Sequence, residues 1–233
     1  MESRETLIQR EEPMKINRTK ENGAHHYQHE GSADAPAPSV TTILSAGLGD
    51  SSRFEEWRKA NPEAAESATA RGTAVHSLIE AYLMSDTNCF NETAKTASDE
   101  VLGYFGAFKD RLDRVEPVAL EKPVIATTPQ GSFGGTIDAL VRIGEALLVV
   151  DWKTNKRKPG KAQLKKWGIQ LGAYAYALEQ QGVVLQGGAV LSAFPTKAGY
   201  SLAEFYWSPS QLQESFSYFL YLVARYNQNK PPE

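Results

Sequence analysis

The amino-acid sequence predicts an α/β fold, in which helices flank a mixed sheet and N-terminal helices form a wall or arch. Two observations favour this class. Two strand-like segments rich in aliphatic residues flank Gly144-Glu145, as in a β-hairpin. Segments in which apolar residues recur at helical spacing precede and follow this hairpin. We therefore expect one large domain over residues 25–233.

The composition is typical of a globular protein with a sizeable core, at 41% hydrophobic and 23% charged residues among 233. No apolar run approaches the length that a membrane span needs. The N-terminal residues are rich in glutamate and do not resemble a targeting peptide. The single cysteine, Cys89, excludes a disulfide within the chain and a cysteine-ligated iron–sulfur cluster. We expect a monomer in a reducing cytoplasm, with no membrane partner.

Residues 36–115 are expected to be mainly helical. Before them, residues 1–24 are polar and lack periodicity, which predicts a disordered arm. Ser39 or Thr41 can cap a first helix that ends near Leu48. The further elements expected in this part are a loose turn or strand at residues 25–29, helices over residues 52–59, 62–84 and 98–114, and an exposed loop over residues 85–97. The longest of these helices begins at a proline and repeats its apolar residues at helical spacing.

Residues 116–207 are expected to form the sheet core. The elements expected there are strands over residues 117–127, 183–194 and 200–207, the hairpin over residues 132–153, and a helix over residues 162–180. Ser208 and Gln211 flank Pro209 as in a capping box, which predicts that a final helix begins there. This C-terminal helix is expected over residues 208–226.

The hairpin is expected to bring two carboxylates together. If its turn has two residues, the register places Asp138 directly opposite Asp151, on one face of the strand pair. Lys153 shares that face, whereas Trp152 points the other way. Opposed carboxylates repel each other unless a proton or a cation lies between them, and a divalent metal with oxygen ligands suits such a pair. A solvated hairpin face with ordinary surface charges is the alternative, which the aliphatic run before Asp151 disfavours.

These residues resemble the core of the PD-(D/E)xK nucleases, in which an aspartate is followed by an Asp/Glu-x-Lys motif. Here the motif is Asp138 and, thirteen residues later, Asp151-Trp152-Lys153. Gly-Gly-Thr-Ile-Asp at residues 134–138 is similar to the RecB-like branch of these nucleases. The resemblance therefore implies a restriction-endonuclease-like core with a mixed sheet and flanking helices.

Three further motifs fit the same branch in the expected order. Residues 71–80 carry its Gly-x-x-x-His spacing, and residues 170–174 carry its Gln-x-x-x-Tyr spacing. Residues 38–44, Pro-Ser-Val-Thr-Thr-Ile-Leu, resemble the opening motif of the mitochondrial genome maintenance exonucleases and of related phage exonucleases. The resemblance covers roughly residues 36–178, and it favours the cytoplasm of a bacterial or phage-infected cell.

The resemblance implies a metal-dependent exonuclease that acts on single-stranded DNA with a free end, in DNA replication, repair or recombination. Mg²⁺ or Mn²⁺ would be held by His76, Asp138, Asp151 and the carbonyl of Trp152. Asp138, Asp151 and Lys153 would be the catalytic residues. Glu80 lies four residues after His76 and would orient its ring or act as a weak ligand. A partly buried histidine with a carboxylate partner is the alternative for this pair.

A basic stripe indicates where nucleic acid would bind. The chain has a net charge of −3, yet residues 152–166 contain seven lysines and arginines and no acid. Lys156, Arg157 and Lys158 would contact phosphates, unless this stripe is only a solvated surface. The resemblance implies that Gln170 and Tyr174 brace Lys153 or touch the DNA strand, with a core tyrosine and a surface glutamine as the alternative. Ser39 and Thr41 could hold a phosphate at a helix N-terminus, although capping alone accounts for them.

Two other functions remain open from the sequence. A non-catalytic subunit of the same fold could hold DNA ends for a partner, and a structure-specific endonuclease could use the same core. His25, His26 and His29 could bind a metal by their spacing, but a turn or strand is favoured. The role of Glu121, in a predicted strand, is left unassigned.

Overall fold

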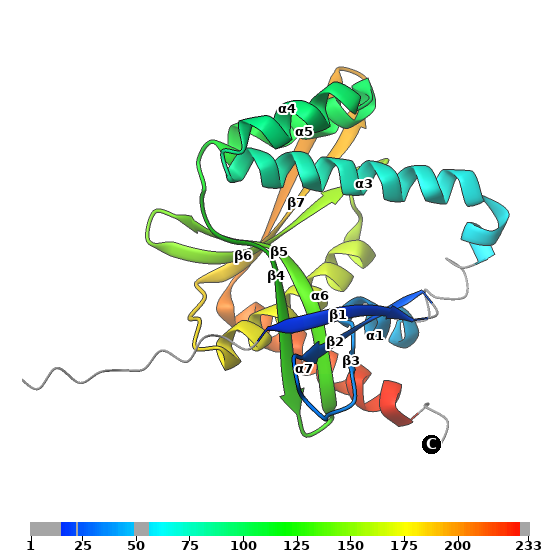
Figure 1. Cartoon of the computed structure of the whole chain (residues 1–233), viewed down its shortest axis with the longest axis vertical. Helices are drawn as coiled ribbons and strands as arrows, with labels where there is room; N and C mark the ends of the chain where they lie inside the picture. The colour runs from blue at the N-terminus through cyan, green and yellow to red at the C-terminus, as the bar shows by residue number, and fades with distance from the viewer. Residues whose placement is uncertain (1–14, 22, 49–55, 229–233) are drawn as a thin grey trace, which may run out of the picture.

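The computed structural model of this chain describes residues 15–21, 23–48 and 56–228. Its larger sheet has five strands in the order β4-β5-β6-β7-β8. These are β4 (Glu116–Thr128), β5 (Gly131–Ile143), β6 (Ala146–Thr154), β7 (Gly187–Thr196) and β8 (Gly199–Trp207). The pair β6–β7 is parallel and the other neighbours are antiparallel, so the sheet is mixed as predicted (Figure 1).

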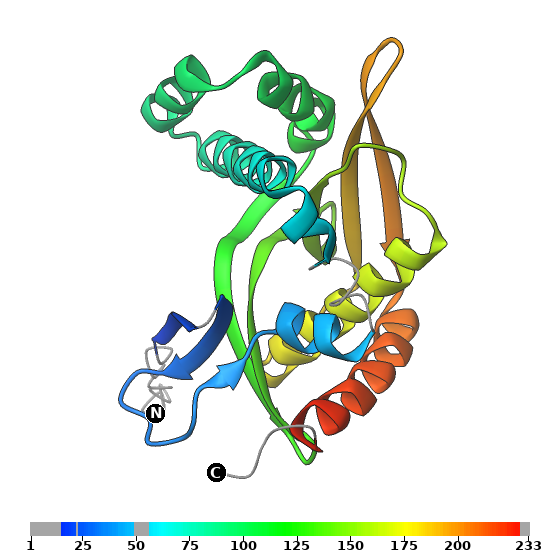
Figure 2. The ribbon, with the colours of Figure 1, turned by 90° about the vertical axis from the view of Figure 1, so that its right-hand side faces the viewer.

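Helices cover both faces of this sheet (Figure 2). One face packs against α1 (Val40–Gly47), α6 (Lys161–Gln180) and α7 (Pro209–Gln228). The other face packs against α3 (Pro62–Leu83) and α5 (Asp99–Leu112), and α4 (Thr87–Thr96) lies against α3. Each face therefore has its own hydrophobic cluster, with the sheet between the two. None of the described helices combines the length and the apolar character that crossing a membrane would require.

A second, three-stranded sheet lies at the N-terminal end of the described chain. It consists of β1 (Ile16–Glu21), β2 (Ala24–His29) and β3 (Ala37–Pro38). The prediction of a disordered arm over residues 1–24 is therefore wrong for β1, which pairs with β2 along its whole length. Because nearly all of β1 is exposed, it lacks the apolar alternation by which a strand is recognised. Residues 1–14 and 22 of that predicted arm lie outside the described residues.

The prediction of an exposed loop over residues 85–97 is also wrong, because most of this segment forms α4. Asp86 caps the helix by accepting a hydrogen bond from the backbone N–H of Cys89 at 2.9 Å. Phe90 packs its ring against those of Tyr82 and Phe105, at centroid distances of 5.9 and 5.3 Å. No residue of α4 is fully buried and most of its residues are polar, which is why the sequence favoured a loop.

Most other predicted elements are confirmed within one or two residues. The two-residue hairpin turn is confirmed, because Ile143 pairs with Ala146 and Gly144 has a positive φ of 59°. The capping box of α7 is confirmed by hydrogen bonds that join Ser208 and Gln211 in both directions. The strand predicted from residue 183 instead begins at Gly187. The helix predicted over residues 52–59 lies partly outside the described residues, and residues 56–60 are helical.

Close contact between α6 and α7 depends on a glycine. A Cβ atom at Gly172 would lie 2.7 Å from the carbonyl oxygen of Leu212 and 2.7 Å from the backbone nitrogen of Phe216. Backbone atoms of a packed helix cannot move as freely as the end of a side chain, so a larger residue would push α7 away from α6. Since α6 also carries Gln170, this packing helps to fix the candidate site described below.

We expect Gly172→Ala to lower the free energy of unfolding by about 1–3 kcal/mol, because it overpacks the α6–α7 contact. Gly106→Ala in α5 is the matched control, since no atom lies within 4 Å of its added Cβ. The control should raise stability by about 1 kcal/mol, from helix propensity alone. Urea denaturation of both variants measures the difference. Equal stability of the two variants would contradict the packing described.

Candidate active site

Strands β5 and β6 separate at Asp138. Their ladder runs from Ile143 and Ala146 to Ala139 and Val150, in the predicted register, and ends there. The expected direct pairing of Asp138 with Asp151 is therefore wrong. A carboxylate oxygen of Asp138 instead accepts a hydrogen bond from the backbone N–H of Trp152 at 2.8 Å. The side chain of Asp138 thus takes the place of the next backbone partner and joins the two strands where they part.

Asp151 and Lys153 form a buried ion pair. Asp151 is 2% exposed, and its Oδ2 lies 2.5 Å from Nζ of Lys153. Burial raises the pKa of Asp151 to about 6, against the lowering effect of Lys153 and with a further rise from Asp138. Burial lowers the pKa of Lys153, but the charges of Asp151 and Asp138 outweigh it and hold this pKa above its usual range. Lys153 therefore keeps its proton beside the carboxylates.

Helix α3 places His76 beside the point of strand separation. Its Nε2 lies 2.9 Å from the carbonyl oxygen of Trp152. Its Nδ1 lies 3.7 Å from a carboxylate oxygen of Asp138 and 4.0 Å from one of Glu121. The ring is 27% exposed and faces carboxylates, which both the metal-ligand prediction and the alternative of a partly buried histidine expected. The spacing in the α3 motif thus brings an imidazole to three neighbouring strands, β4, β5 and β6.

Glu121 is the residue at this site to which the sequence assigned no role. It lies on β4 at the position facing Asp138, where the β4–β5 ladder skips one pair, and its φ is +45°. A positive φ is unusual for glutamate and costs backbone energy, which is often found at functional sites. Burial and the charge of Asp138 raise the pKa of Glu121, while His76 lowers it. A glutamate in an apolar strand next to the hairpin was the only signal in the sequence.

The residues gathered here fit a divalent metal. Within the described chain, His76, Glu121 and Asp138 each offer a ligand atom, and these atoms lie within 4.8 Å of one another. Oδ2 of Asp151 is buried and has no hydrogen-bond partner, only the ion pair with Lys153. The 2.9 Å between Nε2 of His76 and the carbonyl of Trp152 is also the spacing of adjacent ligands around an octahedral ion with bonds of about 2.1 Å. Carboxylates, a carbonyl and one imidazole suit a divalent cation that prefers oxygen ligands.

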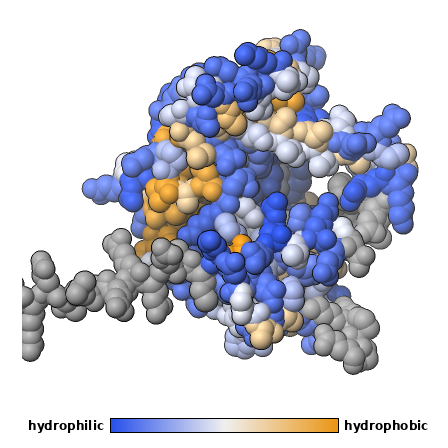
Figure 3. Space-filling view, viewed as in Figure 1, coloured by the Kyte–Doolittle hydropathy of each residue, from blue (hydrophilic) through white to orange (hydrophobic). Residues whose placement is uncertain are grey.

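A cleft of about 430 Å³ opens onto this group between α3 and strands β1 and β4. Viewed as in Figure 1, the surface is hollowed between α3 and the N-terminal sheet, and mostly hydrophilic residues surround the hollow (Figure 3). Glu80 lines the cleft together with His76 and Glu121. No hydrogen bond or ion pair is found between Glu80 and His76 in the described structure. Nε2 of the ring is instead within hydrogen-bonding distance of the carbonyl of Trp152, and Nδ1 faces Asp138 and Glu121. The expectation that Glu80 orients the ring is therefore wrong, whereas its role as a weak ligand stays a prediction.

Gln170 supports Asp151 from α6. Its amide nitrogen donates to Oδ1 of Asp151 at 3.0 Å and lies 3.2 Å from the hydroxyl of Tyr174. Gln170 is 8% exposed and Tyr174 is 4% exposed, so neither side chain is available to touch a DNA strand in this structure. The alternative of a surface glutamine is also wrong, because Gln170 is buried. Bracing is the observed role, although the braced group is Asp151 rather than Lys153.

Two tyrosines hold the start of the Asp138 motif. A Cβ atom at Gly135 would collide with the ring of Tyr174, and one at Gly134 would lie 2.5 Å from Cβ of Tyr27. The hydroxyl of Tyr27 is also 3.1 Å from that of Thr136. The two glycines are therefore needed for close contact of β5 with α6 on one side and β2 on the other. This contact fixes β5 directly before Asp138.

The expected phosphate contacts lie on two other parts of the chain. Ser39 is 3% exposed, and its hydroxyl accepts a hydrogen bond from the backbone N–H of Thr42 at 3.0 Å. Ser39 therefore caps α1 and is not exposed to hold a phosphate. Thr41 is exposed at the same helix N-terminus. The basic segment, Lys156, Arg157 and Lys158, is exposed in the loop between β6 and α6.

His25, His26 and His29, whose spacing could also have fitted a metal site, lie along β2. His25, His26 and His29 each pair with a different residue of β1. The favoured prediction of a turn or strand at residues 25–29 is therefore confirmed, as the strand β2. Among the described residues, the group of His76, Glu121 and Asp138 has metal-ligand spacing, and the three β2 histidines do not.

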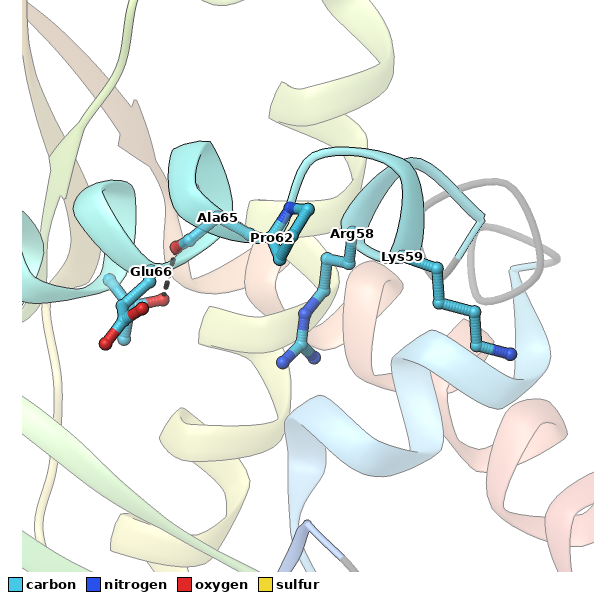
Figure 4. A pocket seen from close by; sticks show the side chains of 6 residues that line it. Arg58, Lys59, Pro62, Ala65 and Glu66 are labelled. Atoms are coloured by element: carbon cyan, nitrogen blue, oxygen red, sulfur yellow. Dashed lines mark hydrogen bonds between the residues drawn. The ribbon is translucent and has the colours of Figure 1, made fainter.

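A larger hollow, of about 540 Å³, lies at the start of α3, and neither Asp138 nor Asp151 lines it. Figure 4 shows two of its lining residues, Arg58 and Lys59, on the far side of Pro62 from Glu66. Pro62 and His76 lie fourteen residues apart on one helix, hence about 21 Å along its axis. None of the groups at the β5–β6 separation lines this hollow, so it is not the candidate active site.

Comparison with known proteins identifies a family model that covers most of the chain. A family model described as the PD-(D/E)XK nuclease superfamily matches residues 48–229, which include α3 and the whole larger sheet. None of the curated proteins matches the chain significantly. A solved structure from Eubacterium rectale, described as a "Putative exonuclease", is 9% identical with a TM-score of 0.46, covering 70% of this chain and 76% of that one. The structure of SSO0001 is 15% identical with a TM-score of 0.37, covering 68% and 76% respectively.

We expect Gln170→Ala to lower the free energy of unfolding by about 1–3 kcal/mol, because a buried oxygen of Asp151 loses its hydrogen-bond donor. Gln180→Ala, at the exposed end of the same helix, is the matched control and should change stability by at most about 0.5 kcal/mol. Urea denaturation without metal measures both. A loss at Gln170 no larger than that of the control would show that the bond to Asp151 contributes nothing to the fold.

Proposed function

The chain belongs to the PD-(D/E)XK nuclease superfamily, and on that basis we propose that it is a metal-dependent deoxyribonuclease that degrades single-stranded DNA from a free end. The observation that carries this proposal is the meeting of His76, Asp138, the Trp152 carbonyl and the Asp151–Lys153 pair where β5 and β6 separate. A nuclease of this fold acts on nucleic acid, and DNA replication, repair or recombination is the proposed setting.

Asp138, Asp151, the carbonyl of Trp152 and His76 would hold Mg²⁺ or Mn²⁺, with Glu121 adjoining them. Such an ion supplies positive charge that polarises the phosphodiester and stabilises the transition state. Lys153 keeps its proton because two carboxylates neighbour it, so it can donate a hydrogen bond to an oxyanion. Gln170 holds one oxygen of Asp151, which leaves the other oxygen directed at Lys153 and the proposed ion.

The basic segment would guide the substrate. Lys156, Arg157 and Lys158 follow Lys153 closely along the chain and are exposed, so they can contact phosphates without reading sequence. Thr41, exposed at the N-terminus of α1, is proposed as a further contact. The buried positions of Gln170, Tyr174 and Ser39 remove these three from the proposed DNA contacts.

A non-catalytic DNA-end-binding subunit is the second candidate, and an endonuclease on the same core is the third. A non-catalytic subunit would tolerate loss of a catalytic group. Asp138, Asp151 and Lys153 are all present and His76 joins them, which favours an enzyme. The choice between exonuclease and endonuclease depends on whether the protein needs a free end.

We expect the protein with Mg²⁺ to degrade linear single-stranded DNA and to leave a circular single strand of matched sequence intact. Gel analysis with label at either end measures the loss of substrate and its direction. Degradation of the circle would instead indicate an endonuclease. Binding of both substrates without degradation of either, in Mg²⁺ and in Mn²⁺, would indicate the non-catalytic subunit.

We expect Asp151→Asn and Lys153→Ala each to abolish cleavage while the circular dichroism spectrum stays that of the parent. Binding of single-stranded DNA should survive in both variants and should rise in Asp151→Asn, because repulsion of phosphate is lower. Asp110→Asn, at an exposed position of α5, is the control and should cleave normally. Robust cleavage by either site variant in Mg²⁺ would contradict the assigned roles.

A further inference from the structure

The cleft at the candidate active site has a second wall, which the N-terminal sheet supplies. Arg18 of β1 lines this cleft across from Gly72, Thr73 and Ser77 of α3. The other lining side chains that can carry charge are His76, Glu80 and Glu121. Arg18 is therefore the one permanent cation among the described residues that line the cleft. The other charged side chains that a phosphodiester strand would meet there are the carboxylates of Glu80 and Glu121.

Arg18 is held in a fixed relation to the site. In the β1–β2 ladder it pairs with Tyr27, whose ring packs on Gly134 and whose hydroxyl is 3.1 Å from that of Thr136. Thr136 lies two residues before Asp138 on β5. The strand that carries Arg18 is thus coupled through one residue of β2 to the strand that carries the central carboxylate, so its side chain does not come from a loosely attached arm.

The guanidinium of Arg18 is available for a ligand. Arg18 is exposed, and no hydrogen bond or ion pair joins it to another described residue. Arg18 and Glu121 both line the cleft, and the charge of Arg18 acts to lower the pKa of Glu121. A guanidinium offers several N–H donors in a planar fork that matches phosphate oxygens, and it keeps its charge at any working pH.

We infer that Arg18 binds a backbone phosphate of the DNA strand that occupies this cleft, so that the β1–β2 hairpin forms part of the substrate-binding surface. This inference rests on the proposed function, since it takes a nucleic-acid strand as the ligand. Arg18 contacts a phosphate rather than a base, so its contribution is independent of sequence. The alternative is that Arg18 only balances the charge of Glu121.

The test measures binding without cleavage. A fluorescent oligodeoxythymidylate is titrated with parent, Arg18→Ala and Arg18→Lys in the presence of chelator, over a series of salt concentrations. Arg18→Ala should bind about tenfold more weakly, as expected for loss of one charge-assisted contact. Its logarithmic salt dependence should be shallower by about 0.7, the value for one phosphate contact on a single strand. Arg18→Lys should restore that salt dependence, because it keeps the charge.

Lys197→Ala is the matched control, because it removes one exposed positive charge in the turn between β7 and β8, far from β1 (Figure 2). Its affinity and salt dependence should equal those of the parent. An equal loss in this control and in Arg18→Ala would reduce Arg18 to a contributor to net charge and overturn the inference. Thermal melts of every variant should coincide, since Arg18 is exposed and makes no described bond.

Repeating the measurement in a Glu121→Gln variant distinguishes phosphate binding by Arg18 from neutralisation of the charge of Glu121. In Glu121→Gln, the Arg18→Ala change should still weaken oligonucleotide binding about tenfold. Disappearance of the loss in this background would show that Arg18 only offsets Glu121, and would overturn the inference. Failure of the proposed function is distinguishable: a protein that binds the oligonucleotide through Arg18 but never cleaves DNA supports this inference and contradicts the enzyme. Normal cleavage with no effect of Arg18→Ala on binding contradicts the inference alone.

Discussion

The separation of β5 from β6 at Asp138 is the constraint on which the rest of the site depends. Where the backbone ladder ends, the N–H of Trp152 needs another partner, and the carboxylate of Asp138 supplies it. This bond places a charged group between two strands instead of on a sheet face. It also leaves the carbonyl of Trp152 directed at His76, so that backbone and side-chain oxygens approach the same point. Continued pairing of the two strands would remove both features.

Burial of Asp151 imposes the second requirement. A buried carboxylate is costly unless it is paired and hydrogen-bonded, and here Lys153 provides the charge while Gln170 provides the bond. The helix that carries Gln170 is held in turn by α7 through the close contact at Gly172. Glu121 adds a further carboxylate at a strained backbone position. The protein thus concentrates negative charge where a divalent cation would relieve it.

The sequence predicted the mixed sheet, most helices and the central residues because these depend on local patterns and short spacings. The two-residue turn determined the register up to Ala139 and Val150, but nothing local shows that the strands separate one pair later. Glu121 was missed because its place depends on how β4 pairs with β5. The strand β1 and the helix α4 were missed because β1 is almost entirely exposed and α4 is mostly polar. The features that the sequence did not predict therefore depend on contacts between residues far apart in the chain.

A crystal structure of the protein with Mn²⁺ would show directly whether the ion lies where β5 and β6 separate, because anomalous scattering locates it without any assumption about its ligands. We expect a peak at bonding distance from Asp138, Asp151 and the carbonyl of Trp152, with Nε2 of His76 turned toward it. Occupied Mn²⁺ sites elsewhere on the protein, with no peak where the two strands separate, would contradict the assignment of these residues as metal ligands.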